Sequence, residues 1–387
     1  MEWASIMQAT MRRPRGGLLH RNGGNDMTAN RKWEIWIGAY APPEEVSITR
    51  LELDGETGEW AKTSEYGGTS NPSFLALNRA GTVLYTVSES EETEGQPGGR
   101  MIAYPIDEES RKLQDGWERL THSAGPCHVS LDPDERWLAV ANYNGSSVTL
   151  YPLEAGGKPG DAMVRLRHSG SGPNPERQEK PHPHSAVFDP LGGRFLYVPD
   201  LGIDRIVVYE NVESGTDWTG VGAAVLSPGD GPRHFAFHPD GRSAYLVNEL
   251  SSSVTRFLHP EAGVLERQET VSTLPGHFQG GNTCAEIAVS PDGRFVYASN
   301  RGHDSIAVFR LDEESGALQP AGHVSTRGRT PRNFAITPDG RWLLAANQDT
   351  DNIALFRVDA ATGLPIYAGT EIPARKPVCV RINPGLR

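Results

Sequence analysis

Residues 231–237 read GPRHFAF and are followed by PDGR at residues 239–242, while residues 330–336 read TPRNFAI and are followed by PDGR at residues 338–341. In both passages the Asp-Gly pair separates two short apolar runs and supplies the positive φ that a tight hairpin turn needs. The runs are short and rich in β-branched and aromatic residues, which indicates strands. The same PDGR turn recurs at residues 291–294. The chain is therefore a repeat of one β unit.

The repeat has the period of a propeller blade, which is roughly 40–50 residues. The seventh unit stops after one strand, and Trp33–Tyr40 and Ser47–Leu53 read like the second and third strands that it lacks. We therefore predict an all-β, seven-bladed β-propeller that is closed by pairing N-terminal and C-terminal strands in one blade, which removes both sheet edges. The units open, at spacings of 46 to 57 residues, with Pro72, Pro126, Pro183, Pro232, Cys284, Pro331 and Pro377.

Composition excludes several classes of function. The 387 residues carry a net charge of −12, so no basic surplus exists to bind a nucleic-acid backbone. Three cysteines cannot build a disulfide framework and suit a reducing cytoplasm. No apolar run reaches the roughly 18 residues of a membrane helix. We expect a cytoplasmic propeller domain over residues 31–387 and a disordered tail over residues 1–30, with Met27 as an alternative start to Met1.

Residues at equal offsets in the repeat form rings around the central channel. Ring positions whose residue type changes from blade to blade therefore indicate a site at the mouth of the channel. The ring just after the opening residue holds Ser73, Cys127, His184, Arg233, Ala285, Arg332 and Val378. The next ring holds Phe74, His128, Ser185, His234, Glu286, Asn333 and Cys379. The ring at the end of the second strand holds Tyr40, Glu89, Tyr143, Asp200, Glu249, Arg301 and Gln348, and Asn300 stands one position before it.

Charged residues of mixed sign beside buried strands are costly unless they are paired or used. Two interpretations are open: salt bridges between blades, or an anion-binding catalytic site at one end of the channel. For the second, Arg233 and Arg301 present donor forks for a carboxylate, a phosphate or an oxyanion. His184 can take a proton from water, and Glu249 can hold that histidine or the water, or carry a proton. The set suits hydrolysis of an ester or lactone.

Other catalytic chemistries have weaker support. The chain has no G-x-S-x-G elbow and no cysteine in a catalytic signature. A metal site built from the carboxylates of Glu89, Asp200, Glu249 and Glu286 is an alternative, but arginines in the same rings would repel a dication. We therefore predict no metal and no cofactor.

The motifs GPRH at residues 231–234, NEL at residues 248–250 and HSA at residues 184–186 resemble those of the seven-bladed lactonase family. That family includes the propeller-type 6-phosphogluconolactonases and the fungal carboxy-cis,cis-muconate cyclases. The resemblance runs from Trp33 to Ile382. It implies lactone hydrolysis, most often of 6-phosphogluconolactone in the pentose phosphate pathway, with four catalytic residues: His184, Glu249, Arg233 and Arg301. The insert at residues 170–180 and the loop at residues 91–100 depart from the family pattern and bear on the substrate.

We predict hydrolysis of a sugar lactone by water that His184 activates with help from Glu249, while two arginines bind the anion and the oxyanion. The residues expected to bind the rest of the substrate are His128, Glu89, Asp200, Glu286, Asn300 and Gln348. The expected partner is a small-molecule lactone, with the protein a monomer or a weak homodimer. The alternatives are a muconate-type lactone cycloisomerase and a non-enzymatic propeller that serves as a binding platform.

Overall fold

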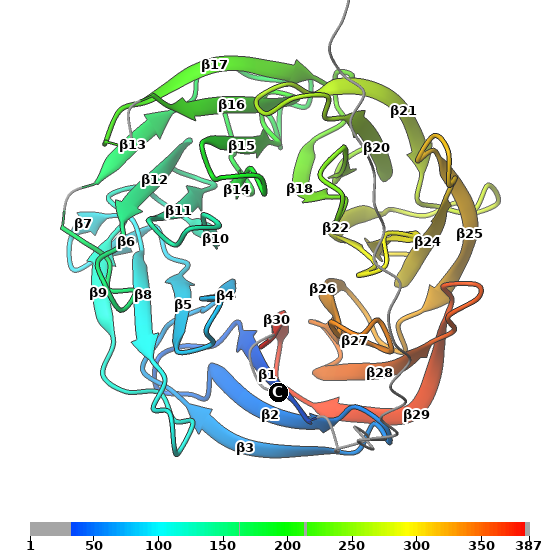
Figure 1. Ribbon diagram of the computed structural model, residues 1–387, viewed down its shortest axis with the longest axis horizontal. Coiled ribbons are helices and arrows are strands. Elements are labelled where there is room, and N and C mark those ends of the chain that lie inside the picture. The colour runs from blue at the N-terminus through cyan, green and yellow to red at the C-terminus, as the bar shows by residue number, and fades with distance from the viewer. Residues whose placement is uncertain (1–31, 162, 213–214, 384–387) are drawn as a thin grey trace, which may run out of the picture.

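The computed structural model describes residues 32–161, 163–212 and 215–383, which form a ring of seven four-stranded sheets around a central channel (Figure 1). The predicted all-β, seven-bladed propeller is confirmed. Within these ranges no helix is present, and so none that is long and apolar enough to span a membrane. The tail predicted over residues 1–30 lies outside the described residues.

Each blade runs from an inner strand at the channel to an outer strand at the rim (Figure 1). The inner strands are β4 (Leu75–Leu77), β10 (Pro126–Leu131), β14 (Val187–Phe188), β18 (Pro232–Phe237), β22 (Thr283–Val289), β26 (Pro331–Ile336) and β30 (Pro377–Ile382). The second strands are β5 (Val83–Ser88), β11 (Trp137–Asn142), β15 (Phe195–Asp200), β19 (Ser243–Asn248), β23 (Phe295–Arg301), β27 (Trp342–Asn347) and β1 (Lys32–Ala39).

The third strands are β8 (Arg100–Pro105), β12 (Ser147–Pro152), β16 (Arg205–Asn211), β20 (Ser253–Leu258), β24 (Ser305–Leu311), β28 (Asn352–Val358) and β2 (Ile48–Asp54). The outer strands are β9 (Trp117–Leu120), β13 (Val164–Arg167), β17 (Trp218–Val225), β21 (Glu266–Ser272), β25 (Leu318–Ser325), β29 (Pro365–Pro373) and β3 (Trp60–Tyr66). A two-stranded hairpin of β6 (Glu92–Thr93) and β7 (Gln96–Pro97) lies in the loop between β5 and β8.

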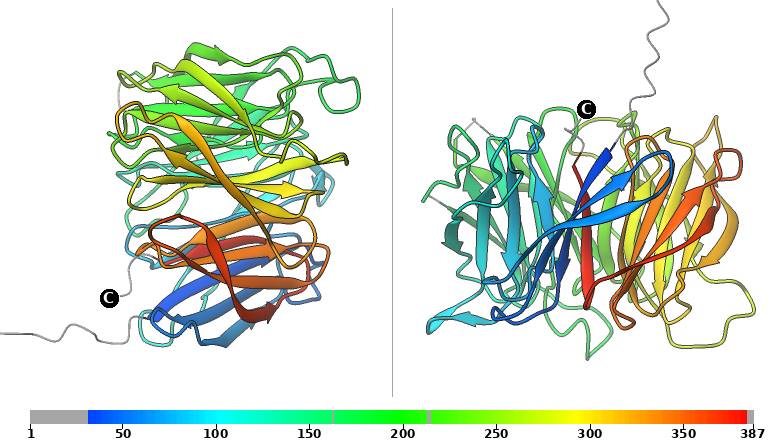
Figure 2. Two further views of the ribbon diagram at one scale, coloured as in Figure 1. Left: turned by 90° about the vertical axis from the view of Figure 1, so that its right-hand side faces the viewer. Right: turned by 90° about the horizontal axis from the view of Figure 1, so that it is seen from below.

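Burial falls from the middle of each blade to its rim. Every residue of β5, β11, β19 and β27 is buried, because the neighbouring blades cover both faces of the second strand. These strands therefore read as continuous apolar runs. The outer strand β21 is mostly exposed and reads ERQETVS. Figure 2 shows the ring edge-on, with the strands of each blade crossing its thickness.

The ring closes through a blade made from both ends of the chain. Its strand order is β3-β2-β1-β30, and β1 pairs with β30 in an antiparallel register that sets Ile35 opposite Ile382 and Ile37 opposite Val380. Figure 1 shows the blue and red strands side by side in this blade. The predicted closure is confirmed, and it leaves each of the seven sheets packed between two others.

A buried carboxylate locks this blade to the next one. Glu34 on β1 is fully buried and accepts hydrogen bonds from Arg50 Nε at 2.6 Å and Arg111 Nη2 at 2.7 Å. It also accepts one from Asn383 Nδ2 at 2.6 Å. Arg50 lies on β2, Arg111 lies in the turn after β8 of the neighbouring blade, and Asn383 follows β30. One side chain therefore joins the first described strand, the last one and the adjacent sheet.

Replacing Glu34 with alanine would remove the buried carboxylate that binds Arg111 and Arg50, and would leave Arg50 with the more exposed Glu52. We expect Glu34→Ala to lower the free energy of unfolding by about 3–5 kcal/mol, as measured by urea denaturation. The control Lys32→Ala removes an exposed ion pair with Glu52 and should cost at most about 1 kcal/mol. Equal losses in the two variants would contradict the role given to Glu34.

Candidate active site

A β-bulge at the start of the inner strands aims side chains into the channel. In β18 the register shifts between Pro232 and His234, and in β26 it shifts between Pro331 and Asn333. The extra residues are Arg233 and Arg332. A bulge leaves its extra residue unpaired and interrupts the regular alternation of side chains between the two faces of the strand. For this reason two consecutive positions of one strand, Arg233 and His234, both contact groups in the channel.

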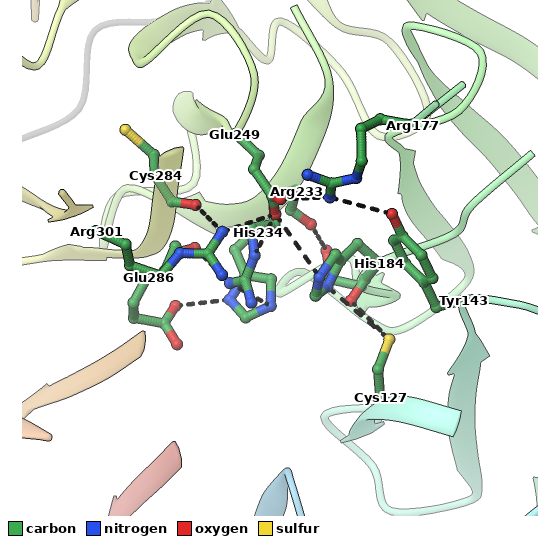
Figure 3. Close-up of polar contacts among 12 residues, drawn as sticks. Cys127, Tyr143, Arg177, His184, Arg233, His234, Glu249, Cys284, Glu286 and Arg301 are labelled. Carbon is green, nitrogen blue, oxygen red and sulfur yellow. Dashed lines mark hydrogen bonds and ion pairs between the residues drawn. The ribbon is translucent and has the colours of Figure 1, made fainter. Parts of the chain in front are cut away.

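Three guanidiniums bind one buried carboxylate at this end of the channel (Figure 3). Glu249 directly follows β19 and is 3% exposed. Its Oε2 lies 2.9 Å from Arg233 Nε and 3.1 Å from Arg301 Nη2, and its Oε1 accepts a hydrogen bond from Arg177 Nη2 at 2.6 Å. Arg301 also donates to the carbonyl of Cys284 at 2.8 Å. The carboxylate is thus held from three separate elements.

The three cations keep Glu249 ionised. Burial by itself would raise the pKa of this carboxyl, but the charges of Arg301, Arg233 and Arg177 outweigh burial and lower the pKa to about 2. The pKa of Arg233 falls to about 10, first through burial and then through the charge of Arg301, so this group stays cationic near neutral pH. The cluster therefore carries an excess of positive charge.

His184 lies beside this cluster as a neutral base. It is 6% exposed, with its Nε2 3.9 Å from Glu249 Oε2 and its Nδ1 3.8 Å from Cys127 Sγ. The rings of Tyr143 and His234 pack edge-on against it. Burial, followed by the charge of Arg233, lowers the pKa of His184 well below 6.5. The imidazole is thus unprotonated at neutral pH and able to accept a proton.

The insert at residues 170–180 supplies a site residue that sequence reasoning missed. Arg177 donates both to Glu249 and to the Tyr143 hydroxyl, the latter at 3.2 Å. The buried Gln178 beside it donates to Asp204 at 2.8 Å, and Asp204 also accepts from the amide of Gly231, just before β18. The loop that carries Arg177 is therefore fixed to the turn that precedes β18, the strand of Arg233. A residue in an insert has no counterpart in the repeat, so no ring position pointed to it.

Arg332, another residue that was not selected, lies at the same end. Its Cζ stands 5.2 Å from the centre of the Tyr40 ring, and the Tyr40 hydroxyl donates to Glu89 at 3.1 Å. The signal was present in the sequence, because Arg332 repeats the Pro-Arg pair of β18 at the same offset. Gln348 also lies at this end, where its amide donates to the neighbouring Asp349.

A second layer of side chains fills the channel axis behind the cluster. The rings of Phe74, His128 and His234, from three different blades, meet with centroids 4.2 to 5.6 Å apart. His234 Nδ1 lies 2.9 Å from Glu286 Oε1, and the other oxygen of Glu286 accepts a hydrogen bond from Asn333. Burial lowers the pKa of His234 to about 4 despite the nearby carboxylate, so its ring is neutral.

This layer separates two predicted substrate-binding residues from the cluster. Both oxygens of Glu286 are already bound. His128 lines a cavity of about 460 Å³ at the opposite end of the channel, which is also bordered by Arg381 and by the far ends of the inner strands. His128 and Glu286 therefore sit behind Arg233 and His184 instead of beside them.

The side chains of Asp200 and Asn300 bond to nearby groups of the protein. Both are fully buried. The Asp200 carboxylate accepts from the amides of His182 and Gly202 and lies 2.6 Å from His168 Nδ1. Asn300 bonds Thr273 through both ends of its amide. These side chains organise turns, because a polar group at the end of a buried strand is used by the nearest backbone or hydroxyl groups.

No group of three or more His, Cys, Asp or Glu side chains within the described ranges is arranged as a metal site. Glu249, the carboxylate nearest to His184, is occupied by guanidiniums. What the cluster offers chemically is a neutral imidazole beside fixed cationic hydrogen-bond donors. Such donors stabilise negative charge that develops on an acyl oxygen.

Replacing Glu249 with glutamine would leave three guanidiniums around a neutral group. We expect Glu249→Gln to lower the free energy of unfolding by about 3–5 kcal/mol at pH 7. The folded pKa of about 2 lies below the ordinary 4.5, so this stabilisation is full above pH 4.5 and is lost as the pH falls toward 2. Urea titrations should show the difference from wild type shrinking over that window.

The control for this experiment is Glu65→Gln, which removes an exposed carboxylate paired with Lys62 and should change stability little at any pH. A stability difference for Glu249→Gln that stays constant from pH 7 to pH 3 would contradict the assignment.

Residues 34–382 match the family described as lactonase, 7-bladed beta-propeller. The 6-phosphogluconolactonase of Bacillus subtilis is 37% identical over 303 residues, which cover 78% of this chain and 84% of the relative. The 6-phosphogluconolactonase of Formosa agariphila is 35% identical and covers 77% and 85%. The solved structure of the periplasmic gluconolactonase of Pseudomonas aeruginosa has a TM-score of 0.85 at 32% identity and covers 91% of this chain and 99% of its own. The predicted resemblance is confirmed: this chain belongs to the seven-bladed β-propeller lactonase family.

Proposed function

We propose that this protein hydrolyses an anionic sugar lactone, with 6-phosphogluconolactone as the substrate and 6-phosphogluconate as the product. The observation that carries the proposal is the charge at the mouth of the channel. Among the described residues, the four arginines Arg177, Arg233, Arg301 and Arg332 outnumber the carboxylates that they face, which are Glu249, Glu89 and, in the layer behind, Glu286, so positive charge is in excess. A phosphate monoester carries a charge of about −1.5 to −2 at pH 7 and is complementary to that excess. Two relatives are named for this activity.

His184 is the proposed general base. Its imidazole is neutral at the pH of the cell and lies at the edge of the guanidinium cluster. Water that is hydrogen-bonded to this ring would attack the lactone carbonyl while its proton passes to the imidazole. The ring oxygen of the lactone leaves and takes that proton back, so the histidine ends as it began. The product is the open-chain acid.

Arg233 and Arg301 are the proposed partners of the oxyanion. Their guanidinium groups are fixed by Glu249, so their donors need little rearrangement when charge develops on the carbonyl oxygen. This changes the role that we give to Glu249. A carboxylate with a pKa of about 2 and three guanidinium partners is a poor proton carrier, so we propose that it positions the two arginines.

For the rest of the substrate, we propose that Glu89 and Gln348 bind sugar hydroxyls, because both lie at the end of the channel that holds Arg332. The cytoplasmic location and the monomeric or weakly dimeric state stay predictions. The Pseudomonas aeruginosa relative is periplasmic, so family membership does not fix the compartment.

Replacing His184 with alanine removes the proposed base. We expect the enzymatic rate on 6-phosphogluconolactone, after subtraction of spontaneous opening, to fall by about 10²–10⁴-fold. The control His277→Ala removes an exposed imidazole and should keep the wild-type rate. Equal rates in wild type and His184→Ala would refute the proposed mechanism. Turnover of a carboxylated muconate instead would identify a cycloisomerase, and no turnover on a lactone panel would favour a binding platform.

The pH dependence of the reaction tests the protonation state of His184. The group faces Arg233, Glu249, Cys127 and the ring of Tyr143, and its pKa lies below 6.5. The neutral form persists as the pH drops to 6.5, so kcat/KM should be flat from pH 7.5 to 6.5 and decline only below that value. A midpoint of the acid limb at or above pH 6.5 would contradict a base in this environment.

A further inference from the structure

Arg332 differs from the other three arginines at the mouth of the channel. Arg177, Arg233 and Arg301 all bind Glu249. Among the described residues, no carboxylate lies within 4.0 Å of the Arg332 guanidinium and no side-chain hydrogen bond from it is found. The residue is nevertheless partly buried. A guanidinium has five N–H donors, and donors left free in a half-buried place are available to a ligand.

The surroundings hold Arg332 in place without using its donors. The bulge in β26 turns it out of the strand alternation. Its guanidinium lies over the face of the Tyr40 ring, and the Tyr40 hydroxyl is itself tied to Glu89. An aromatic face attracts a cation and limits its movement while leaving the edge of the guanidinium open. That edge is the part that binds a phosphate in two-point fashion.

Arg332 shares the central space with the proposed catalytic groups. Of these groups, Arg233 lines a small cavity of about 10 Å³ together with Arg332, which is room for about one water molecule. The charge of Arg332 also contributes to the lowered pKa values of Arg233, Arg301 and His184. Arg332 is therefore close enough to these groups to act on them electrostatically from the same end of the channel.

We propose that Arg332 determines specificity by binding the phosphate of the substrate, at the end remote from the lactone carbonyl. The inference rests on the proposed function. Arg233 and Arg301 already have Glu249 as a counter-ion and face the side of His184. Among the described residues, Arg332 has no counter-ion in hydrogen-bond contact. A phosphate can therefore bind it without breaking an ion pair within the protein.

The test compares two lactones that differ only in the phosphate. We expect Arg332→Ala to lower the ratio of kcat/KM for 6-phosphogluconolactone to that for glucono-1,5-lactone by about 10- to 100-fold, the size of a lost charged hydrogen bond. Arg332→Lys keeps the positive charge but lacks the paired N–H donors of a guanidinium, so we expect its kcat/KM ratio to lie between those of Arg332→Ala and wild type. The control Arg329→Ala removes an exposed arginine three positions earlier and should leave the ratio unchanged. A ratio that does not change in Arg332→Ala overturns the proposal.

Product binding separates this proposal from the function on which it rests. Calorimetric titration with 6-phosphogluconate, a stable compound, should give a dissociation constant at least about 10-fold weaker for Arg332→Ala than for wild type. Titration with gluconate should show no such gap between the two proteins. If wild type hydrolyses neither lactone, the proposed function fails. The role of Arg332 is tested separately by binding: equal affinities of wild type and Arg332→Ala for 6-phosphogluconate would overturn it.

Discussion

Closure of the ring is the constraint on which the rest of this structure depends. The second strands are mostly apolar and buried on both faces, so each is stable only between two neighbouring blades. Seven blades satisfy this condition together once β1 and β30 pair, and Glu34 reinforces that closure with a buried ion pair. The mouth of the channel takes its charged groups from most of the blades, so the site exists only because the ring is complete.

The site brings several guanidinium groups close together, and rigid backbone elements hold them in these positions. Desolvation of a guanidinium is costly, and the three that surround Glu249 share one carboxylate. Their backbone positions come from rigid strands, from a bulge and from a loop that Asp204 anchors. The excess positive charge favours an anionic ligand, while burial, followed by the charge of Arg233, lowers the pKa of the nearby His184 imidazole.

Offsets within the repeat predicted the convergence of His184, Arg233, Glu249 and Arg301, because equal offsets put residues on one ring of the channel. The same reasoning did not predict that the side chains of Asp200 and Asn300 bond to neighbouring backbone and hydroxyl groups. It also placed His128 and Glu286 with the cluster, although they lie in the layer behind it. An offset fixes the place of a Cα along the channel but not the direction of its side chain.

Short-range patterns that repeat along the chain were sufficient to predict the strands, their turns, the number of blades and the pairing of the two ends. The sequence also identified the family. The contacts between side chains of different blades were not predicted: Glu249 binds three guanidiniums, Arg177 joins them from an insert, and Arg332 has no carboxylate within 4.0 Å in the part of the chain that the structure describes. Those facts depend on distances between side chains of different blades, which are set by the closed ring and its bulges and by no local pattern.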